Sequence, residues 1–269
     1  MRRIKRSDNH ESGVSETVGF IIIFGIVMTG IGLVTLYGYP MLLQQQAEAN
    51  VKNMQKTMIV LQTDINSLTF KNVQYQETAI QVAGGTLSVK DVPNPKPYFE
   101  IQIPSEPSVI VYPGKLRFIS EDGATIIALE NGAVITRYPG ISGSYMNAEP
   151  RWYYDETTNT FVITLIRIVG REDFGQTGIG TVAIELSDTN PPHDNRYSIP
   201  AGSSVNILYH NDLPNDDFFR AWEMYFQKPD LQLSESTGNN PPFDLNYEFS
   251  PSVDSTLVIK TVNMTVLSL

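Results

Sequence analysis

The pattern of apolar positions begins with one uninterrupted run near the start of the chain. Val18–Tyr37 comprises twenty residues without a formal charge. As a helix rising 1.5 Å per residue, this run covers about 30 Å, the thickness of the hydrocarbon core of a bilayer. Ile21-Ile22-Ile23 and their neighbours leave no polar face, which argues against a helix of a soluble domain. The run therefore predicts a membrane-spanning helix.

The charges on either side of this run predict its orientation. Four of the first six residues are Lys or Arg, whereas the next basic residue after the run is Lys52. Because basic residues favour the cytoplasmic side, the N-terminus is expected in the cytoplasm and the rest of the chain outside. A cleaved secretory signal fits less well, since its apolar region is about 7–15 residues long and ends at a small-x-small site. The predicted location is thus a single-pass membrane protein with an extracellular part.

A second helical pattern follows the apolar run. Gly38 and Pro40 predict a kink or short break, because proline removes a helical hydrogen bond. Beyond it, apolar residues recur at spacings of three and four, as in a heptad seam. The seam comprises Val51, Met54, Met58, Leu61, Ile65 and Leu68. A stripe this narrow packs on one surface, either the chain's own β-domain or a neighbouring helix in an assembly.

From about Thr78 the pattern changes to short β-type runs separated by Gly, Pro, Asn and Asp. The predicted strands are Tyr98–Ile103, Val109–Tyr112, Leu116–Ile119, Thr125–Glu130, Ala133–Tyr138, Arg151–Tyr154, Thr160–Val169, Thr181–Leu186, Val205–Tyr209 and Thr256–Leu267. Asn131-Gly132 predicts a two-residue hairpin, and Asp155–Asn159 predicts a longer one. The fold class is therefore α+β, a long kinked N-terminal hydrophobic helix followed by a mainly antiparallel β-sandwich.

One later segment has a helical pattern. Asp217–Lys228 places Phe218, Ala221, Trp222 and Tyr225 on one face, with Asp216 or Asp217 as the helix cap. This aromatic face predicts core packing, with a ligand platform as the alternative. Thr189–Arg196 and Leu231–Phe243 are rich in Pro, Asn and Ser and are predicted to be surface loops. Residues 76–269 are long enough for one β-rich domain with a sizeable core.

Composition narrows the function classes. The chain has a net charge of −10; its first 13 residues hold four basic and two acidic residues, leaving 15 basic and 27 acidic residues beyond them. An acidic exterior argues against nucleic acid as a partner, because that binding depends on Lys and Arg contacts with phosphate. Cysteine is absent, so neither disulfides nor thiolate chemistry contribute.

No set of residues in the sequence predicts catalysis, a metal site or a cofactor. His10, His193 and His210 are separated from one another and from partners at metal-ligand spacing. Gly175–Gly180 is glycine-rich, but it precedes a predicted strand and is interpreted as a loop. The run Asn211–Asp217 fits either a calcium-binding loop or a turn with a helix cap. Asn263-Met264-Thr265 is a candidate glycosylation sequon. We predict a protein that is not an enzyme.

The start of the apolar run carries a family resemblance. The segment Gly13-Val14-Ser15-Glu16-Thr17-Val18-Gly19-Phe20-Ile21-Ile22 resembles the processing region (class III signal peptide) of archaeal type IV pilin-like proteins. In that family a prepilin peptidase removes a short basic leader after a small residue. The resemblance implies cleavage between Gly13 and Val14, giving a leader of residues 1–13 and a helical part of residues 14–75. Glu16 stands where the family often has Pro, and Ser15 or Glu16 is expected to cap the helix and complement its dipole.

The resemblance also implies a function. It suggests a structural subunit, major or minor, of a pilus-like filament or a pseudopilin-like assembly on the cell surface. Its partners would be copies of itself or other pilin-like subunits, the prepilin peptidase, the assembly machinery and the membrane. Gly25, Gly30 and Gly32 would permit close helix packing. The alternative is a monomeric, signal-anchored β-domain that binds the cell envelope or a ligand.

Overall fold

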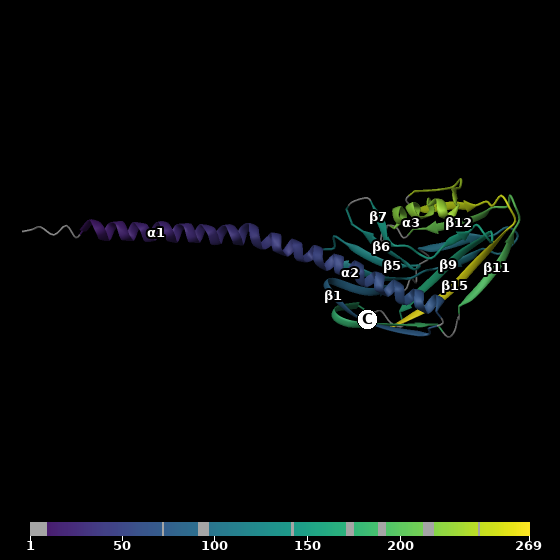
Figure 1. The fold of residues 1–269 in the computed structure, drawn as a ribbon, viewed down its shortest axis with the longest axis horizontal. Coiled ribbons are helices and arrows are strands. Elements are labelled where there is room, and N and C mark those ends of the chain that lie inside the picture. The colour runs from purple at the N-terminus through teal and green to yellow at the C-terminus, as the bar shows by residue number, and fades with distance from the viewer. Residues whose placement is uncertain are drawn as a thin grey trace, which may run out of the picture. The chain divides into compact units, whose positions relative to one another are not determined.

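The computed structural model describes residues 10–71, 73–90, 97–140, 143–170, 175–187, 192–211, 218–241 and 243–269. The chain divides into two compact units, Met1–Ala49 and Asn50–Leu269. The helices are α1 (His10–Leu33), the π-helix η1 (Val34–Gly38), α2 (Tyr39–Phe70), α3 (Phe219–Phe226) and the 3-10 turn η2 (Pro229–Leu231). The long N-terminal helix followed by a mostly antiparallel β-domain confirms the predicted α+β class (Figure 1).

The predicted irregularity near Pro40 is a stretch of π-helix. Over Val34–Gly38 the helix widens, and the backbone N–H of Tyr39 donates to the carbonyl of Val34, five residues earlier. Pro40 has no backbone N–H to donate to the carbonyl four residues earlier, so the α-helical hydrogen-bond pattern is interrupted just before it. Single π-turns are a recognised cause of helix bending.

The strands are more numerous than predicted, and all of them lie in the second unit. They are β1 (Tyr75–Lys90), β2 (Tyr98–Gln102), β3 (Val109–Val111), β4 (Lys115–Ser120), β5 (Ile126–Glu130), β6 (Ala133–Arg137), β7 (Ser144–Ala148), β8 (Tyr153–Asp155), β9 (Thr160–Gly170), β10 (Gly175–Leu186), β11 (His193–Ile199), β12 (Val205–His210), β13 (Ser234–Glu235), β14 (Asp244–Phe249) and β15 (Ser255–Ser268).

Two sheets form the β-domain. The large sheet has the order β7-β6-β5-β4-β1-β10-β15-β9-β8, with β11 also paired to β15, and the small sheet has the order β13-β14-β12-β2-β3. Within the described residues every pair of strands is antiparallel except β9 and β15, which run parallel from Thr160 beside Thr256 to Gly170 beside Val266.

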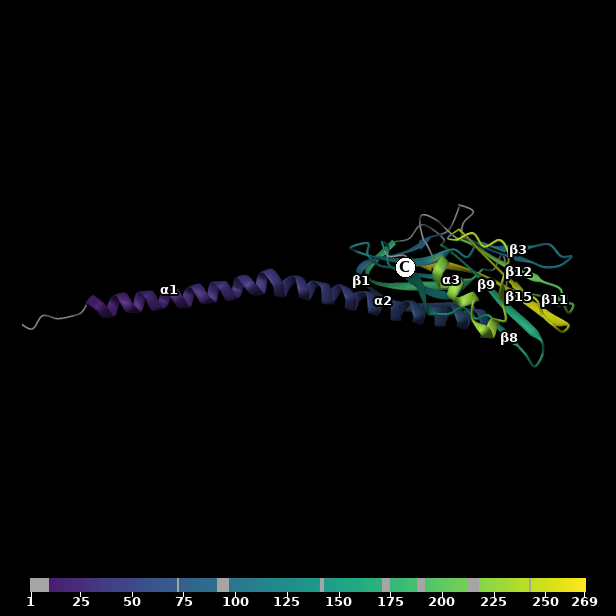
Figure 2. The ribbon, with the colours of Figure 1, turned by 90° about the horizontal axis from the view of Figure 1, so that it is seen from above.

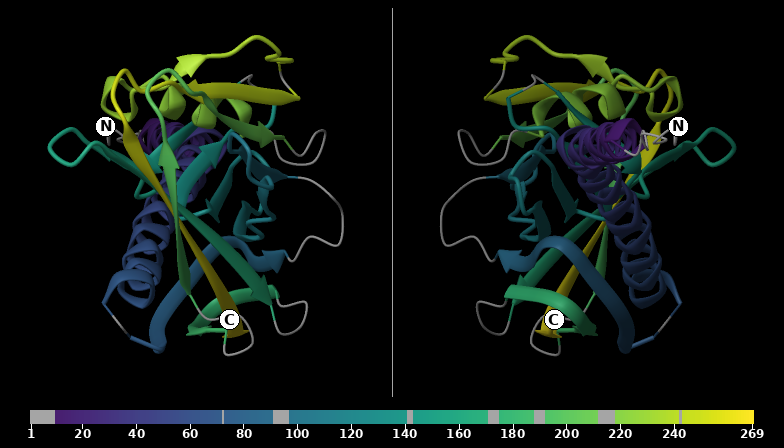
Figure 3. Two further views of the ribbon diagram at one scale, coloured as in Figure 1. Left: turned by 90° about the vertical axis from the view of Figure 1, so that its right-hand side faces the viewer. Right: turned by 90° about the vertical axis from the view of Figure 1, so that its left-hand side faces the viewer.

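The second unit is layered around the large sheet (Figure 3). One hydrophobic cluster lies between the large sheet and the small sheet with α3, and it includes Phe99, Phe161, Tyr209 and Trp222. A second cluster lies between the opposite face of the large sheet and residues 50–70 of α2, which run along the domain in Figure 2. The predicted sandwich is thus covered on its outer side by the chain's own helix.

The seam of α2 supplies the helical half of this second cluster. Met54, Met58, Leu61, Ile65 and Leu68 are fully buried, and Val51 packs half-buried beside them. They contact apolar residues of the sheet such as Val82, Phe118 and Met264. Because the seam is filled by the chain's own sheet, its alternative partner, a neighbouring helix, is not needed to cover it.

Polar bonds set the position of α2 on the sheet. The buried side-chain amide of Gln62 donates to the carbonyl oxygens of Gly132, at 2.7 Å, and of Glu149, at 2.8 Å. Thr78 donates its hydroxyl to the carboxylate of Asp64 at 2.5 Å. Since hydrogen bonds require defined geometry, these contacts fix the register that apolar packing alone leaves loose.

Both predicted hairpins are present. Asn131 and Gly132 have φ angles of 48° and 75°, so both occupy the left-handed region that a two-residue hairpin between β5 and β6 requires. Residues 156–159 link β8 to β9, and Asp155 accepts bonds from the hydroxyl of Thr158 and the backbone N–H of Thr157. These two bonds hold the pKa of the Asp155 carboxyl below its usual value.

Several local predictions were wrong. β1, β7, β11, β13 and β14 were not predicted. β7, β11 and β13 are polar and short of apolar alternation, whereas β14 alternates regularly (Asp-Leu-Asn-Tyr-Glu-Phe) and was overlooked at the end of a loop-like segment. Gly175–Gly180 belongs to β10 rather than a loop, and His193–Arg196 belongs to β11. Pairing with long neighbouring strands compensates for the low strand propensity of these residues.

The later helix is shorter than predicted. α3 spans Phe219–Phe226, its N-cap residue is Phe218 and no side chain caps it. The backbone N–H of Phe218 donates instead to the side-chain oxygen of Asn211 at 3.3 Å. The expected caps Asp216 and Asp217 lie outside the described residues. The aromatic face is buried in the first cluster, as core packing predicts.

The seam can be tested by comparing two adjacent positions of α2. Met58 is 0% exposed, whereas Ile59 is 37% exposed. Met58→Asp removes a buried apolar side chain and places a charge in the core, so we expect a loss of at least about 3 kcal/mol of unfolding free energy. Ile59→Asp should cost far less. Urea unfolding followed by the fluorescence of buried Trp152 and Trp222 measures both changes, and equal losses would contradict the seam.

Candidate functional site

The first unit exposes large apolar side chains from Val18 to Leu43. Among the described residues, the helical stretch Glu16–Phe70 is the one long and apolar enough to cross a membrane. The exposed large apolar side chains of this part are Val18, Phe20, Ile21, Ile22, Ile23, Phe24, Ile26, Val27, Met28, Ile31, Leu33, Val34, Leu36, Tyr37, Tyr39, Met41, Leu42 and Leu43. Such a surface is stable in lipid or against other apolar helices, not in water.

Glycines and threonines interrupt this apolar surface. A Cβ atom added at Gly25, Gly30 or Gly32 would meet nothing within 4 Å. These positions are therefore open on the helix surface, where they would let another helix approach closely. The hydroxyl groups of Thr29 and Thr35 donate to the carbonyl oxygens of Gly25 and Ile31, so both are satisfied within the helix.

The residues of the predicted processing site lie in the first turns of α1. The backbone of Gly13, Val14, Ser15 and Glu16 lies within α1. The expected cap by Ser15 or Glu16 concerns the processed chain and stays a prediction. A cut between Gly13 and Val14 would move both residues into the first turn of the helix. The basic residues of the leader lie outside the described residues.

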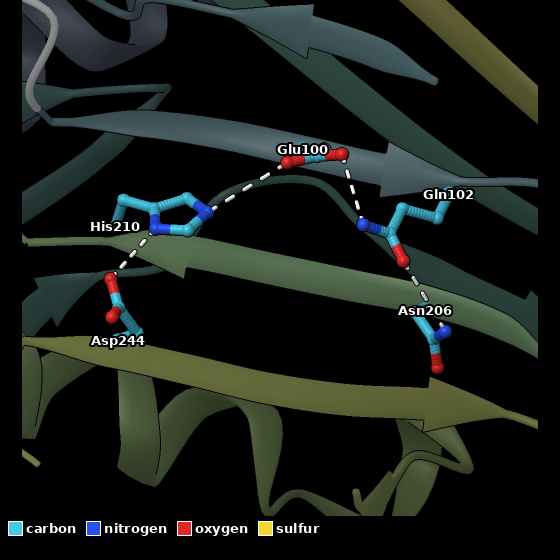
Figure 4. A network of polar contacts seen from close by, with 5 residues as sticks. All are labelled: Glu100, Gln102, Asn206, His210 and Asp244. Atoms are coloured by element: carbon cyan, nitrogen blue, oxygen red, sulfur yellow. Dashed lines mark hydrogen bonds and ion pairs between the residues drawn. The ribbon is translucent and has the colours of Figure 1, made fainter. Parts of the chain in front are cut away.

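The small sheet carries a polar cluster that the sequence did not predict. His210 was interpreted as isolated, but the fold places carboxylates of two neighbouring strands on either side of it (Figure 4). Its Nδ1 atom lies 2.7 Å from Oδ1 of Asp244, and its Nε2 atom lies 3.9 Å from Oε2 of Glu100. The ring of Tyr98 stacks on the imidazole with centroids 4.0 Å apart. The cluster thus bridges β2, β12 and β14.

Amide side chains extend this cluster along β2 and β12. Gln102 donates to Glu100 at 3.0 Å, and Asn206 donates to Gln102 at 3.5 Å (Figure 4). Burial raises the pKa of the Tyr98 hydroxyl, and the carboxylates of Glu100 and Asp244 raise it further. The polar contacts of His210, Glu100 and Asp244 thus link three adjacent strands of the small sheet.

A second polar cluster lies inside the sandwich. Lys115 and Glu130 are adjacent across β4 and β5, both side chains are 0% exposed, and their Nζ and Oε2 atoms are 3.5 Å apart. Oε1 of Glu130 accepts bonds from Tyr209 at 3.2 Å and from the indole N–H of Trp222 at 3.1 Å. The Lys115 ammonium group also lies 5.1 Å from the centre of the Phe218 ring. This cluster joins both sheets to α3.

The remaining residues considered for glycosylation or metal binding either lie in paired strands or fall outside the described residues. Asn263 lies in β15, opposite Arg167 of β9, so its sequon is part of a paired strand rather than a loop. His193 begins β11 opposite Thr261. Asp212–Asp217, the run considered for calcium, lie outside the described residues. Within the described ranges, no group of three or more His, Asp or Glu residues is arranged to hold a metal ion.

Comparison with known proteins places the chain in a family. A family model described as a family of unknown function, DUF7289, matches residues 13–266. Because the match covers nearly the whole chain, the protein belongs to this family. Searches of curated proteins and of solved structures give no match. The family match begins at Gly13, the residue before the predicted cut.

The buried ion pair allows a test of what stabilises the sandwich. Glu130→Gln breaks this buried ion pair while the ammonium group of Lys115 stays in the core, and we expect a loss of about 3–5 kcal/mol of unfolding free energy. Lys115→Met combined with Glu130→Gln removes both charges, so most of that loss should be recovered. Urea unfolding of the single and double variants measures the difference. A double variant less stable than Glu130→Gln would show that the charges stabilise the fold together.

Proposed function

We propose that the protein is an archaeal type IV pilin-like structural subunit, major or minor, of a surface filament or a pseudopilin-like assembly. The observation that carries this proposal is the division of one helical region between two surroundings. From Val18 to Leu43 its apolar side chains are exposed, whereas from Met54 to Leu68 an apolar stripe is buried on the chain's own β-domain. This is the organisation that the resemblance of residues 13–22 implies.

The energetic logic follows from this division. An apolar helix of this length is stable in a bilayer, where its backbone groups bond internally. It can leave the lipid only for surroundings that are equally apolar, such as a bundle of like helices. The open positions at Gly25, Gly30 and Gly32 support close packing in such a bundle. The β-domain would then form the outer surface.

In this proposal the chain has a structural role rather than a catalytic one. Its orientation follows from the basic leader, with the N-terminus in the cytoplasm and the β-domain outside the cell. Its partners would be copies of itself or other pilin-like subunits, a prepilin peptidase and the assembly machinery. The acidic charge of the chain, −10 overall, suits an exposed domain with no nucleic-acid partner.

Processing provides the first test. Gly13 lies within α1, so the peptidase must open the helix at this point to reach the bond after Gly13. Glycine lowers the cost of that opening by about 1 kcal/mol relative to alanine, and its lack of a side chain lets the backbone be approached closely. Gly13→Val should therefore leave the full-length precursor, as read by intact mass of the protein from its native membranes.

Gly25→Val is the matched control for this test. It makes the same substitution twelve residues further along, beyond the segment that resembles the processing region, and should still be processed. A wild-type protein that keeps residues 1–13 would remove the main support of the pilin-like proposal. It would favour instead the alternative, a monomeric signal-anchored β-domain that binds the cell envelope or a ligand.

The second test concerns which part of the chain drives assembly. Because the β-domain is acidic, isolated domains repel one another, and more strongly at low ionic strength. Residues 50–269 should therefore be monomeric by light scattering in low-salt buffer. The processed full-length protein should form higher oligomers or filaments visible by negative-stain microscopy. A full-length protein that stays monomeric in mild detergent and in native membranes would contradict assembly through the helix.

A further inference from the structure

One edge of the large sheet lacks a strand partner. β10 pairs with β1 on one side from Gly175 onward, but on its other side it meets β15 only from Ala183, which lies beside Ser268. Within the described part of the chain, no strand pairs with this other side over Gly175–Val182. An open edge of this length presents backbone groups that are not bonded to a neighbouring strand, and another strand can use them.

The open edge lacks the devices that usually prevent such pairing. Gly175–Ile184 contains no charged residue and no proline, although the chain as a whole carries −10. Natural sheets place lysines or prolines at exposed edges to block them. Ile179 projects from this stretch with 81% of its surface exposed and glycines on both sides. Two copies of this acidic chain can therefore approach each other along this segment without repulsion between like charges.

Side chains of the same molecule donate hydrogen bonds to carbonyl oxygens along this edge. The side-chain amide of Gln176 donates to the carbonyl oxygens of Thr177, at 3.0 Å, and of Ile179, at 3.1 Å. The hydroxyl of Ser268 donates to the carbonyl of Thr181 at 3.1 Å. Ser268 belongs to β15, so the Thr181 carbonyl marks the edge turned away from β1, and Ile179, two residues earlier, directs its carbonyl to the same side. Flexible side chains thus stand where a neighbouring strand would bond.

We propose that the open edge of β10 is a pairing surface for a second copy of this chain, with the Gln176 and Ser268 side chains as exchangeable caps. Two β10 edges related by a two-fold axis would pair antiparallel, with Ile179 near the axis and no like charges facing each other. Displacement of the caps makes the pairing weak in solution. It is favoured when anchoring in one membrane raises the effective concentration of the copies. The pairing rests on the membrane anchoring of the proposed function but not on filament formation.

Cysteine cross-linking of the full chain in native membranes tests this pairing, because the protein has no cysteine of its own. Single cysteines are placed at Thr177, Ile179 and Thr181, used alone and in mixed pairs. Facing residues of paired strands have Cβ atoms about 4.5–5.5 Å apart, within reach of a short thiol–thiol cross-linker. The yield of cross-linked dimer should be several-fold higher than with the control Ala201→Cys, because Ala201 is an exposed residue in a turn outside β10. Yields equal to that control would overturn the pairing.

A pair of glutamine variants tests the caps. Gln176→Leu frees the two carbonyls and should raise the cross-linking yield several-fold. Gln81→Leu is the matched control, because Gln81 is an exposed residue of β1 opposite Ile179 and donates no bond to this edge in the described structure. Ile179→Lys places a charge at the edge and should abolish the cross-links between cysteines at 177 and 181. Equal yields for the two leucine variants would overturn the role of the caps.

The outcomes separate this inference from the proposed function. Filaments and normal processing without edge cross-links would overturn the pairing alone. Edge cross-links in a protein that keeps residues 1–13 and forms no filaments would overturn the pilin-like function alone. Each property is read on the same membrane preparation.

Discussion

The interaction on which the second unit depends is the burial of the α2 seam on the large sheet. Met54, Met58, Leu61, Ile65 and Leu68 lose nearly all contact with water there. Each such side chain contributes about 1.5–3 kcal/mol when buried. Without this cover, the apolar residues of β1, β4, β10 and β15 that face α2 would form a large exposed patch. The helix is therefore part of the β-domain's core and not an appendage to it.

The same helical region meets two different surroundings because its sequence changes character along its length. Up to Leu43 apolar side chains occupy all sides, and beyond Asn50 they narrow to a stripe with polar residues on the other faces. An all-apolar surface suits lipid or a helix bundle, whereas a stripe suits one packed sheet. The π-turn before Pro40 lies within the all-apolar part, where it gives the helix a place to bend.

Polar groups inside the β-domain select one arrangement among many that apolar packing allows. The Lys115–Glu130 pair is bonded to side chains from β12 and α3, so the two sheets and the helix must come together in one register. Asn131, fully buried in the β5–β6 turn, accepts the backbone N–H of Ile166 at 2.7 Å and ties that turn to β9. A shifted register would leave these groups unsatisfied, at a cost of about 1–3 kcal/mol each.

Local sequence patterns correctly predicted the features that depend on residues close together in the chain. The apolar run, the interruption near Pro40, the spacing of the seam, the Asn131-Gly132 turn and the aromatic face of α3 all follow from periodicity or backbone preference. Strands with such patterns, including β5, β6 and β9, were predicted nearly to their ends. Strands such as β7 and β11 were missed because pairing, not composition, holds them extended.

Contacts between distant residues could be decided only by the tertiary structure. His210 looked isolated because Glu100 is 110 positions before it and Asp244 is 34 positions after it, yet strand pairing places both beside its ring. Lys115 and Glu130 carry no sequence signal of burial, since charged residues are usually exposed. The open edge of β10 exists only because β15 begins to pair at Ala183. The sequence by itself determined which segments are apolar, which are helical and which form turns. Only the tertiary structure decided which polar groups meet and which strand edge stays open, because these features depend on pairing between strands that are far apart in the sequence.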